Sequence, residues 1–279
     1  MIKSFSKINL FLKVLKKNSN GLHNIQSSVM LLDLHDNISL KKINKKKDEI
    51  KFIGQFPKKI NKKTNTISKS LFLLRKYNLI SLKKRYKITV NKKIPVFSGL
   101  GGGTSNAVFL IKYFLKNKVD DKLLKIFEER IGTDFRLFFL NHSFQKSLKK
   151  IFKFKEKYVF YFVLVYPDVY SSTKEVYSKV KKFSLPLKND LSKVGSKSGY
   201  IKFIKNENND LQKIVEKKHK NISKILDLIK VQKNCLFSRM TGSGSVCFGI
   251  FSNRKSAKEG LIKIQKRLPN YWSILTRSI

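Results

Sequence analysis

Cysteine is scarce in this chain of 279 residues, where Cys235 and Cys247 are the only two. Two cysteines cannot build a framework of several disulfides, and no C-x-x-C pair or Cys/His spacing typical of zinc ligands accompanies them. The sequence therefore excludes a disulfide-rich scaffold and a zinc module. We expect reduced thiols and no metal held by a dedicated set of protein ligands.

Long apolar runs are also lacking. The longest, Tyr158 to Tyr166, has about half of the roughly 20 residues that a membrane-spanning helix needs. Its β-branched and aromatic residues favour a buried strand. Near the N-terminus, Lys7 and Asn9 interrupt what would be the apolar part of a signal peptide. These absences predict a cytoplasmic protein with no membrane partner.

Acidic residues are few, with 18 Asp and Glu against 61 Lys and Arg, and the net charge is +43. Such a charge suggests nucleic-acid binding, because clustered cations neutralise phosphates. The cations are mostly lysines scattered among Asn, Ile and Phe, however, a pattern that A/T-rich codons explain, and specific readers of bases favour arginine. We expect no nucleic acid as the main partner, and a solvated surface that steers anionic small molecules.

The apolar share of 41% is sufficient for a sizeable core. Alternation from Phe5 to Val14 predicts a strand that has Lys7 and Asn9 on one face. Further strands are predicted over 26–43, 49–53, 86–90, 158–166, 246–251 and 271–275, and helices over 65–77, 105–115, 121–131, 174–180, 209–229 and 256–266. Strands and helices do not alternate regularly, so the sequence favours an α+β fold with two domains, 1–150 and 151–279.

One glycine-rich segment reads Pro95-Val96-Phe97-Ser98-Gly99-Leu100-Gly101-Gly102-Gly103-Thr104-Ser105 and leads into a predicted helix. Glycines let the backbone approach a ligand closely, and the amides at a helix N-terminus attract anions. The pattern is neither a Walker loop nor a dinucleotide fingerprint. It predicts a phosphate cradle, with a tightly packed turn as the alternative. A second segment, 239–245, suits either a site or a hairpin turn.

Five segments in order along the chain resemble the superfamily of galactokinase, homoserine kinase, mevalonate kinase and phosphomevalonate kinase, the GHMP kinases. They are the P-x-x-x-G-L-G-x-G-x-S pattern of 95–105, together with 4–12, 20–27, 132–134 and 240–244. The resemblance implies a two-domain architecture, with the active site in the cleft between an N-terminal ATP-binding domain and a C-terminal domain that contributes to the substrate site. The pattern is most similar to the branch that phosphorylates the 2-hydroxyl of a cytidine-diphosphate-linked methylerythritol in the non-mevalonate route to isoprenoid precursors.

The same resemblance implies the roles of individual residues. Lys7 and Asp134 would form the catalytic pair, and phosphoryl transfer does need a carboxylate to orient the attacking hydroxyl and cations to receive spreading charge. The ATP phosphates, bridged by Mg²⁺, would lie on every residue from Pro95 to Ser105. Asn65 and Lys92 align with residues that hold the adenine. A helix-capping asparagine and a surface lysine are the simpler alternatives.

On the substrate side, Asn9 and His23 match positions near the cytidine, and Tyr177 falls where an aromatic ring stacks on cytosine. A structural turn histidine and a core aromatic are the alternatives for His23 and Tyr177. The chain departs from the family pattern at three places: Leu22 replaces a tyrosine, Arg136 replaces a proline, and 141–150 replaces a glycine-rich continuation.

Two other functions remain open from the sequence. One is a kinase for another small alcohol, of the homoserine or mevalonate type. The other is a basic nucleic-acid-binding protein on a degenerate kinase scaffold. The sequence makes no prediction of the oligomeric state.

Overall fold

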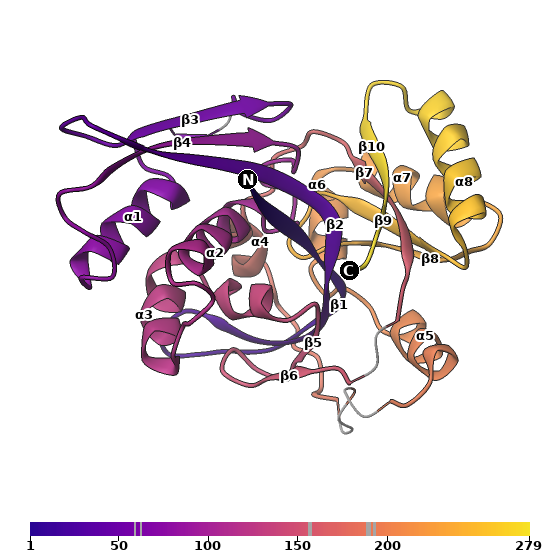
Figure 1. The fold of residues 1–279 in the computed structure, drawn as a ribbon. Helices are drawn as coiled ribbons and strands as arrows, with labels where there is room; N and C mark the ends of the chain where they lie inside the picture. The colour runs from indigo at the N-terminus through magenta and orange to yellow at the C-terminus, as the bar shows by residue number, and fades with distance from the viewer. Residues whose placement is uncertain (59, 62, 156–157, 188–190, 192–193) are drawn as a thin grey trace. The chain divides into compact units, whose positions relative to one another are not determined.

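The chain forms two compact units in a computed structural model that describes all residues except 59, 62, 156–157, 188–190 and 192–193 (Figure 1). The first unit contains Met1–Ser6, Leu34–Val96 and Gly101–Phe139, and the second contains Lys7–Asp33, Phe97–Leu100 and Leu140–Ile279. Each unit is therefore assembled from segments that lie far apart in the sequence. The domain division near residue 150 stays a prediction.

The first unit is built around one end of a sheet. The later part of β2 (His23–Ile43) pairs antiparallel with β4 (Arg85–Lys92), which pairs in parallel with β3 (Glu49–Gly54). Strand β1 (Ile2–Lys17) contributes its first residues. Apolar side chains from β2, β4 and two helices form the core of this unit, namely Ile38, Ile67, Leu71, Tyr86, Ile88, Val90 and Leu110.

Two of the three α-helices that the structure describes in the first unit lie close to their predicted bounds. Helix α1 (Thr66–Lys76) has Asn65 as its N-cap, and its predicted range is 65–77. Helix α3 (Asp121–Ile131) has Asp120 as its N-cap and ends before Gly132, which matches the predicted range of 121–131. Gly132 has φ +153° and ψ +154°, a positive-φ conformation that side chains other than hydrogen disfavour. Helix α2 (Gly102–Phe114) begins three residues earlier than predicted, inside the glycine run, with Gly101 at φ +70° as its N-cap. A short 3₁₀ helix, η1 (Phe135–Phe139), follows α3.

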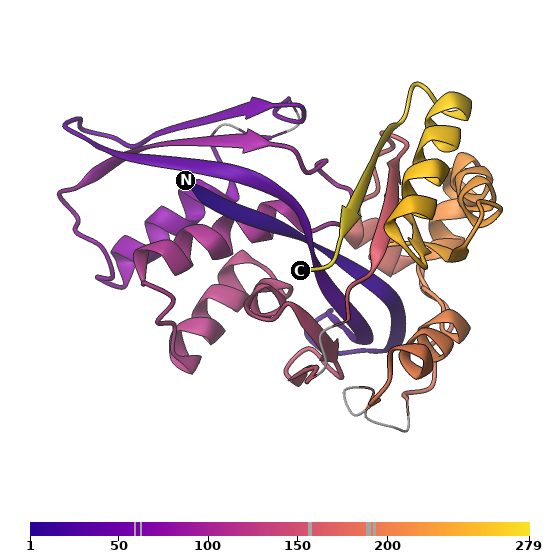
Figure 2. The same cartoon turned by 45° about the vertical axis from the view of Figure 1, so that its right-hand side comes forward.

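The second unit contains a four-stranded antiparallel sheet in the order β10-β7-β9-β8. Its strands are β7 (Tyr161–Tyr166), β8 (Cys235–Met240), β9 (Cys247–Phe251) and β10 (Trp272–Arg277). Helices α7 (Asn221–Lys230) and α8 (Arg254–Arg267) pack on this sheet, as both views show (Figures 1 and 2). The first part of β2 also belongs here and pairs with β5 (His142–Gln145), which pairs with β6 (Ile151–Lys153).

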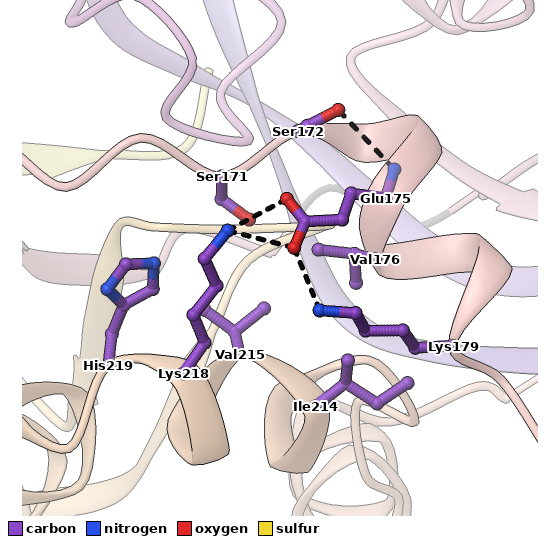
Figure 3. Close-up of a pocket in the computed structure, with 9 residues that line it drawn as sticks. All are labelled: Ser171, Ser172, Glu175, Val176, Lys179, Ile214, Val215, Lys218 and His219. Atoms are coloured by element: carbon purple, nitrogen blue, oxygen red, sulfur yellow. Dashed lines mark hydrogen bonds and ion pairs between the residues drawn. The ribbon is translucent and has the colours of Figure 1, made fainter.

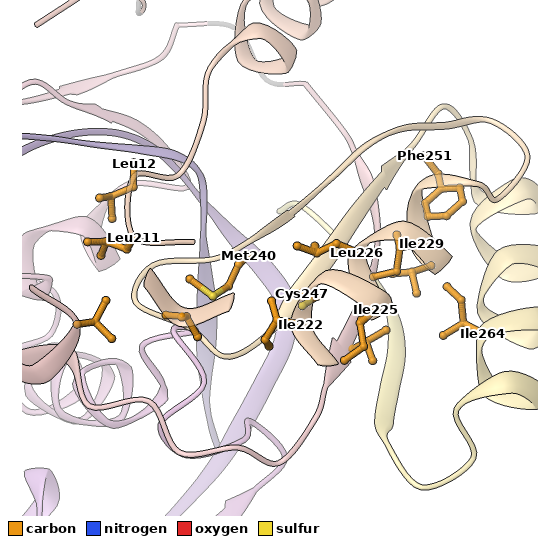
Figure 4. Close-up of a cluster of buried hydrophobic side chains, with 14 of the residues drawn as sticks. Leu12, Leu211, Ile222, Ile225, Leu226, Ile229, Met240, Cys247, Phe251 and Ile264 are labelled. Carbon is orange, nitrogen blue, oxygen red and sulfur yellow. The ribbon is translucent and has the colours of Figure 1, made fainter. Parts of the chain in front are cut away.

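A buried apolar cluster joins the N-terminal strands to the C-terminal part of the second unit (Figure 4). Leu12 and Val14 of β1 and Ile25 of β2 pack in one cluster with residues of β7 to β9 and of the helices. Ile222, Ile225 and Ile229 come from one face of α7, the i, i+3, i+7 spacing of an amphipathic helix. The second unit therefore needs both ends of the chain for its core.

Several elements differ from the sequence prediction. The predicted helix over 209–229 is two helices, α6 (Gln212–Lys218) and α7, separated at His219 and Lys220. Strands β5, β6 and β8 and helix α5 (Lys197–Asn206) were not predicted. The polar, Lys/Ser-rich sequence of 187–198 predicts a long loop, and part of it lies outside the described residues. Among the described helices, none has the length and apolar content needed to cross a bilayer.

Candidate active site

Lys7 and Asn9 are neighbours on one face of β1, and both are almost completely buried, with 4% and 3% of their surface exposed. The Lys7 ammonium donates to Asn9 Oδ1 at 2.5 Å, and Asn9 Nδ2 donates to Ser27 Oγ of β2 at 2.8 Å. The backbone N–H of Asn9 donates to Thr241 Oγ1 at 2.9 Å. The predicted lysine therefore belongs to a network that crosses from β1 to β2 and to the second glycine-rich segment.

The two glycine-rich segments pack against each other, backbone to backbone. Gly99 has φ +79°, and a Cβ on it would lie 2.3 Å from the carbonyl oxygen of Thr241. A Cβ on Gly242 would lie 3.2 Å from Asn9 Oδ1 and 3.5 Å from the Lys7 ammonium. Glycine is therefore required at position 99 by both the backbone conformation and the available space. The segment 239–245, which the sequence left open between a site and a turn, lies directly beside Lys7.

Backbone hydrogen bonds hold this arrangement together. The Lys7 N–H donates to the Leu100 carbonyl at 3.0 Å, and the Val246 N–H donates to the Ser98 carbonyl at 3.1 Å. Asn209 Nδ2 donates to the carbonyls of Met240 and Gly242, both at 2.8 Å. These bonds connect residues 97–100 to β1 and to the segment before β9.

The residues from Gly101 onward belong to the first unit and start α2. Gly101 is an N-cap without a side chain, and no side-chain hydrogen bond caps α2 among the described residues. The first-turn amides of a helix lack partners within the helix and carry the positive end of its dipole. At Gly103 a Cβ would meet only Thr66, at 3.7 Å. This helix start fits an anionic group such as a nucleotide phosphate.

Ser105, the last residue of the predicted cradle, makes a structural contact. Its hydroxyl donates to the Phe5 carbonyl at 2.5 Å and lies 2.7 Å from Ser4 Oγ. It therefore fastens α2 to the start of β1 within the first unit.

Lys92 is buried in an ion pair rather than lying on the surface. Its ammonium pairs with Asp36 and also donates to Asn106 Oδ1 at 3.1 Å, and only 2% of Lys92 is exposed. Burial lowers the pKa of Lys92, and the charge of Asp36 offsets part of that shift. Asn106 Nδ2 donates in turn to Asp36 and to Ser4 Oγ, both at 2.9 Å. The described contacts give Lys92 a structural role at the base of α2, and its predicted contact with adenine stays a prediction.

Asn65 is the N-cap of α1. Its Oδ1 accepts from the Ser68 N–H at 3.0 Å, and Ser68 Oγ accepts from the Asn65 N–H at 3.1 Å, so the two form a capping box. This is the simpler of the two roles that the sequence allowed. The predicted contact of Asn65 with adenine stays a prediction.

Asp134 lies between α3 and η1, in the chain reversal that follows Gly132. Its carbonyl accepts from the Leu137 N–H at 3.1 Å. Arg136, which replaces the usual proline, pairs with Glu128 of α3, with 2.9 Å between Nε and Oε2. The departure at position 136 therefore supplies an ion pair that ties this turn to α3. Asp134 belongs to the first unit and Lys7 to the second, and their catalytic pairing stays a prediction.

His23 and Tyr177 come together as the sequence interpretation requires. Their ring centroids are 5.0 Å apart with 34° between the ring planes, and Phe183 is the next ring from His23, at 6.4 Å. Burial, and then the charge of Lys17, lower the pKa of His23, so its ring is neutral at neutral pH. A neutral ring beside a tyrosine can both stack on a base and exchange hydrogen bonds with it.

Helix α4 (Thr173–Ser178) carries Tyr177 and is tied to the second glycine-rich segment. Ser171 Oγ donates to the Ser243 carbonyl at 2.6 Å, and Thr173 Oγ1 lies 2.9 Å from Ser243 Oγ. On its other side, α4 borders a small groove with α6, across which Glu175 pairs with Lys218 (Figure 3). The two lysine partners of Glu175 lower its pKa to about 2.

Sequence reasoning missed the partners that complete the network. Thr241, Ser27 and Asp36 are all buried and bond to predicted residues, but their roles depend on long-range pairing. The glycines around Thr241 were the one local signal. In the described part of the chain, no group of three or more His, Cys, Asp or Glu side chains is arranged to hold a metal ion.

Comparison with known proteins defines the class. Residues 65–132 match the GHMP kinases N terminal domain, and residues 199–270 match the family described as GHMP kinases C terminal. A solved homoserine kinase from Cytophaga hutchinsonii aligns with a TM-score of 0.68 at 18% identity, over 100% of this chain and 96% of that one. The chain is a member of the GHMP kinases, and the predicted α+β fold class is confirmed.

Full-length relatives narrow the class further. The 4-diphosphocytidyl-2-C-methyl-D-erythritol kinase of Pelagibacter ubique (strain HTCC1062) is 37% identical, over 100% of this chain and 98% of the relative. The kinase of the same name from Wolbachia pipientis wMel is 32% identical, with the same coverage. A crystal structure of 4-(cytidine 5'-diphospho)-2C-methyl-D-erythritol kinase has a TM-score of 0.76 at 18% identity, over 99% of this chain and 98% of that one. The chain belongs to the family of 4-diphosphocytidyl-2-C-methyl-D-erythritol kinases.

Proposed function

We propose that this chain transfers the terminal phosphoryl group of ATP to the 2-hydroxyl of 4-diphosphocytidyl-2-C-methyl-D-erythritol. Membership of the kinase family supports the use of ATP and an alcohol acceptor. The observation that carries the assignment is the packing of Gly242 against Asn9 and the buried Lys7 ammonium, together with the hydrogen bond from the Lys7 N–H to the Leu100 carbonyl beside Gly99. A cytoplasmic location, where ATP is plentiful, is part of the proposal.

Each predicted residue has a defined task in this reaction. Asp134 orients the acceptor hydroxyl and takes its proton as the oxygen attacks the terminal phosphorus. The Lys7 ammonium stabilises negative charge on the attacking oxygen and on the transferred group, and Asn9 holds that ammonium in place through its Oδ1. His23 and Tyr177 bind the cytosine.

Magnesium would serve the phosphate donor. When bound, Mg²⁺ would neutralise negative charge on the phosphates of ATP. The described residues offer no cluster of carboxylates for it, so phosphate oxygens and water would supply most of its ligands. The amides at the start of α2 and the glycines of 97–105 would hold the phosphates themselves.

The direct test is incubation with ATP, Mg²⁺ and 4-diphosphocytidyl-2-C-methyl-D-erythritol, followed by phosphorus NMR or mass spectrometry for the 2-phosphate. Homoserine and mevalonate, offered separately, serve as competing acceptors. The proposal predicts a 2-phosphate product that forms only in the presence of the cytidine-linked alcohol. Equal or faster turnover of homoserine or mevalonate would overturn the substrate assignment and leave the kinase assignment standing.

A further inference from the structure

Gln145, at the end of β5, is a buried polar residue whose hydrogen-bonding groups are unused. Only 1% of the residue is exposed, and neither Oε1 nor Nε2 has a hydrogen-bond partner among the described residues. A buried amide without partners costs stability, so buried amides are nearly always bonded. An exception of this kind needs an explanation, and a ligand that supplies the missing partners is one.

The strand register places Gln145 next to the catalytic network. Gln145 is directly opposite Ser27 in the antiparallel pair of β5 and β2. Side chains of directly opposed residues project from the same face of the sheet with their Cβ atoms about 5 Å apart. Ser27 accepts a hydrogen bond from Asn9, which in turn accepts one from Lys7. A single residue, Ser27, therefore lies between Gln145 and the hydrogen-bonded pair of Asn9 and Lys7.

His23 lies on the same face of β2 but farther along the strand. It is four residues from Ser27, a distance of about 13 Å along an extended chain. Gln145 is thus closer to the Lys7 end of this face, where the alcohol reacts, than to the His23 end, where the cytosine binds. Like Lys7 and Asn9, which are 4% and 3% exposed, Gln145 is almost completely buried.

Hydrogen bonds hold the hairpin that carries Gln145 in place. The hairpin between β5 and β6 is closed by the Lys146 N–H, which donates to the Lys150 carbonyl at 2.9 Å. Asn24 of β2 accepts from the Leu148 N–H at 3.3 Å. Strand β5 and the turn that follows it lie within 141–150, the segment in which the sequence departs from the glycine-rich family pattern. The departure therefore introduces a carboxamide into the substrate face.

We propose that Gln145 is a further substrate-binding residue, whose carboxamide exchanges hydrogen bonds with the hydroxyl groups of the methylerythritol portion of the acceptor. The inference rests on the proposed function. A carboxamide presents a donor and an acceptor side by side, which suits adjacent hydroxyls, each of which can both donate and accept. The bound alcohol satisfies the two groups that the protein leaves without partners.

The test compares Gln145→Leu and Gln145→Met with the wild-type enzyme. Both variants keep the volume and remove the polar groups. We expect KM for the cytidine-linked alcohol to rise about tenfold, because its hydroxyls lose their partners, while KM for ATP stays constant. We also expect the melting temperature to rise by about 2–6 °C, because the unpaired buried amide is gone. A purely structural role would not produce this combination of weaker substrate binding and higher stability.

Ser143→Ala provides the matched control. Ser143 is two residues away on β5, also buried and also without a partner for its hydroxyl in the described structure, but it is opposite Val29 rather than Ser27. We expect its KM values to equal those of the wild type. Calorimetric titration with cytidine diphosphate, which lacks the methylerythritol, should give the same affinity in all variants. Weaker binding of cytidine diphosphate to Gln145→Leu would overturn the assignment to the polyol.

The outcomes also separate this inference from the proposed function. If the wild type neither binds nor phosphorylates the cytidine-linked alcohol, the proposed function is rejected and this inference with it. If the wild type does both while Gln145→Leu and Gln145→Met retain its KM for the alcohol, only the role of Gln145 is rejected.

Discussion

Burial of the Lys7 ammonium is the most consequential feature at the scale of single residues. An ammonium removed from water loses much of its solvation, so it must find partners in the protein. Asn9 supplies one, and its own amide is held by Ser27. This chain of bonds fixes the cation beside the glycine-rich segments. In the proposed reaction, a cation that is already positioned would need little reorganisation when charge develops on the transferred phosphoryl group.

The carboxylate of Asp134 gives the first prediction at this scale. Asp134→Asn should lower kcat by about 10²-fold or more, because the change removes the anionic base but keeps the size of the side chain. Binding of ATP, measured by calorimetry, should remain within about twofold. Lys7→Ala should show the same separation of turnover from nucleotide binding. Wild-type turnover in Asp134→Asn would reject the catalytic role of this carboxylate.

Gly99 gives a prediction about stability. Gly99→Ala should lower the free energy of unfolding by about 2–4 kcal/mol, because the new Cβ would lie 2.3 Å from the Thr241 carbonyl and φ is +79°. Urea unfolding measures the change. Gly103→Ala is the matched control, since its Cβ would make ordinary contacts at 3.7 Å, and we expect a change of less than about 0.5 kcal/mol. Similar stability of both variants would show that the packing of the two segments is not tight.

His142 gives a prediction about pH. Burial lowers its pKa to about 3, and the ring stacks on Phe154 at 3.6 Å, with Nε2 2.9 Å from the Tyr200 hydroxyl. Between pH 6.5 and 3 the unfolded chain binds a proton at this histidine and the folded chain does not. Stability therefore falls as the pH falls through this window, by about 2 kcal/mol between pH 7.5 and 5 from this group.

The non-titrating variant His142→Gln isolates this contribution from that of other groups. We expect the wild type to lose about 2 kcal/mol more than the variant between pH 7.5 and 5, as measured by urea unfolding at both pH values. Parallel losses in the two proteins would show that His142 becomes protonated in the folded state.

At the scale of helices and strands, the sequence predicted correctly those elements whose ends are set by neighbouring residues. Helix α3 matches its predicted bounds because Asp120 caps its start and Gly132 ends it. Strands β5 and β6 could not be predicted, since they have only four and three residues. Strand β5 depends on pairing with the distant β2, and β6 pairs with β5. The apolar period of α6 and α7 continues across His219, so the break between these helices is set by packing rather than by sequence.

Helix α4 gives a prediction at this scale. Ser171→Ala should lower the free energy of unfolding by about 1 kcal/mol and raise KM for the cytidine-linked alcohol, because the buried Ser243 carbonyl loses its 2.6 Å bond and the helix that carries Tyr177 loses an anchor. Glu175→Gln serves as the control. Exposed ion pairs contribute little, so its stability should stay close to wild type. A larger loss in Glu175→Gln would mean that the ion pairs, not the buried hydroxyl, hold α4.

At the scale of the whole molecule, the sequence predicted an α+β kinase of the correct family, and the division near residue 150 stays a prediction. Residues 7–33 and 97–100 belong to the same compact unit as residues 140–279. Composition and periodicity contain no signal for such an assembly. The association of Leu12, Val14 and Ile25 with the C-terminal core arises only when distant strands meet.

This assembly predicts that residues 140–279 do not fold alone. The isolated fragment lacks Leu12, Val14 and Ile25 and the partner strand of β5, so its core would be open to water. We expect a broad, non-cooperative melting curve and strong binding of the dye ANS. The full chain is the control. A sharp cooperative transition of the fragment would show that these N-terminal residues are dispensable for the core.

The enclosure of Lys7 and Lys92 has a practical consequence for a protein so rich in lysine. Acylating reagents reach amines through solvent, and these two side chains are only 4% and 2% exposed. Mild treatment with such a reagent would acylate the many exposed lysines first and leave Lys7 and Lys92 unmodified. Fluorophores or surface tethers could therefore be attached in this way without altering either amine.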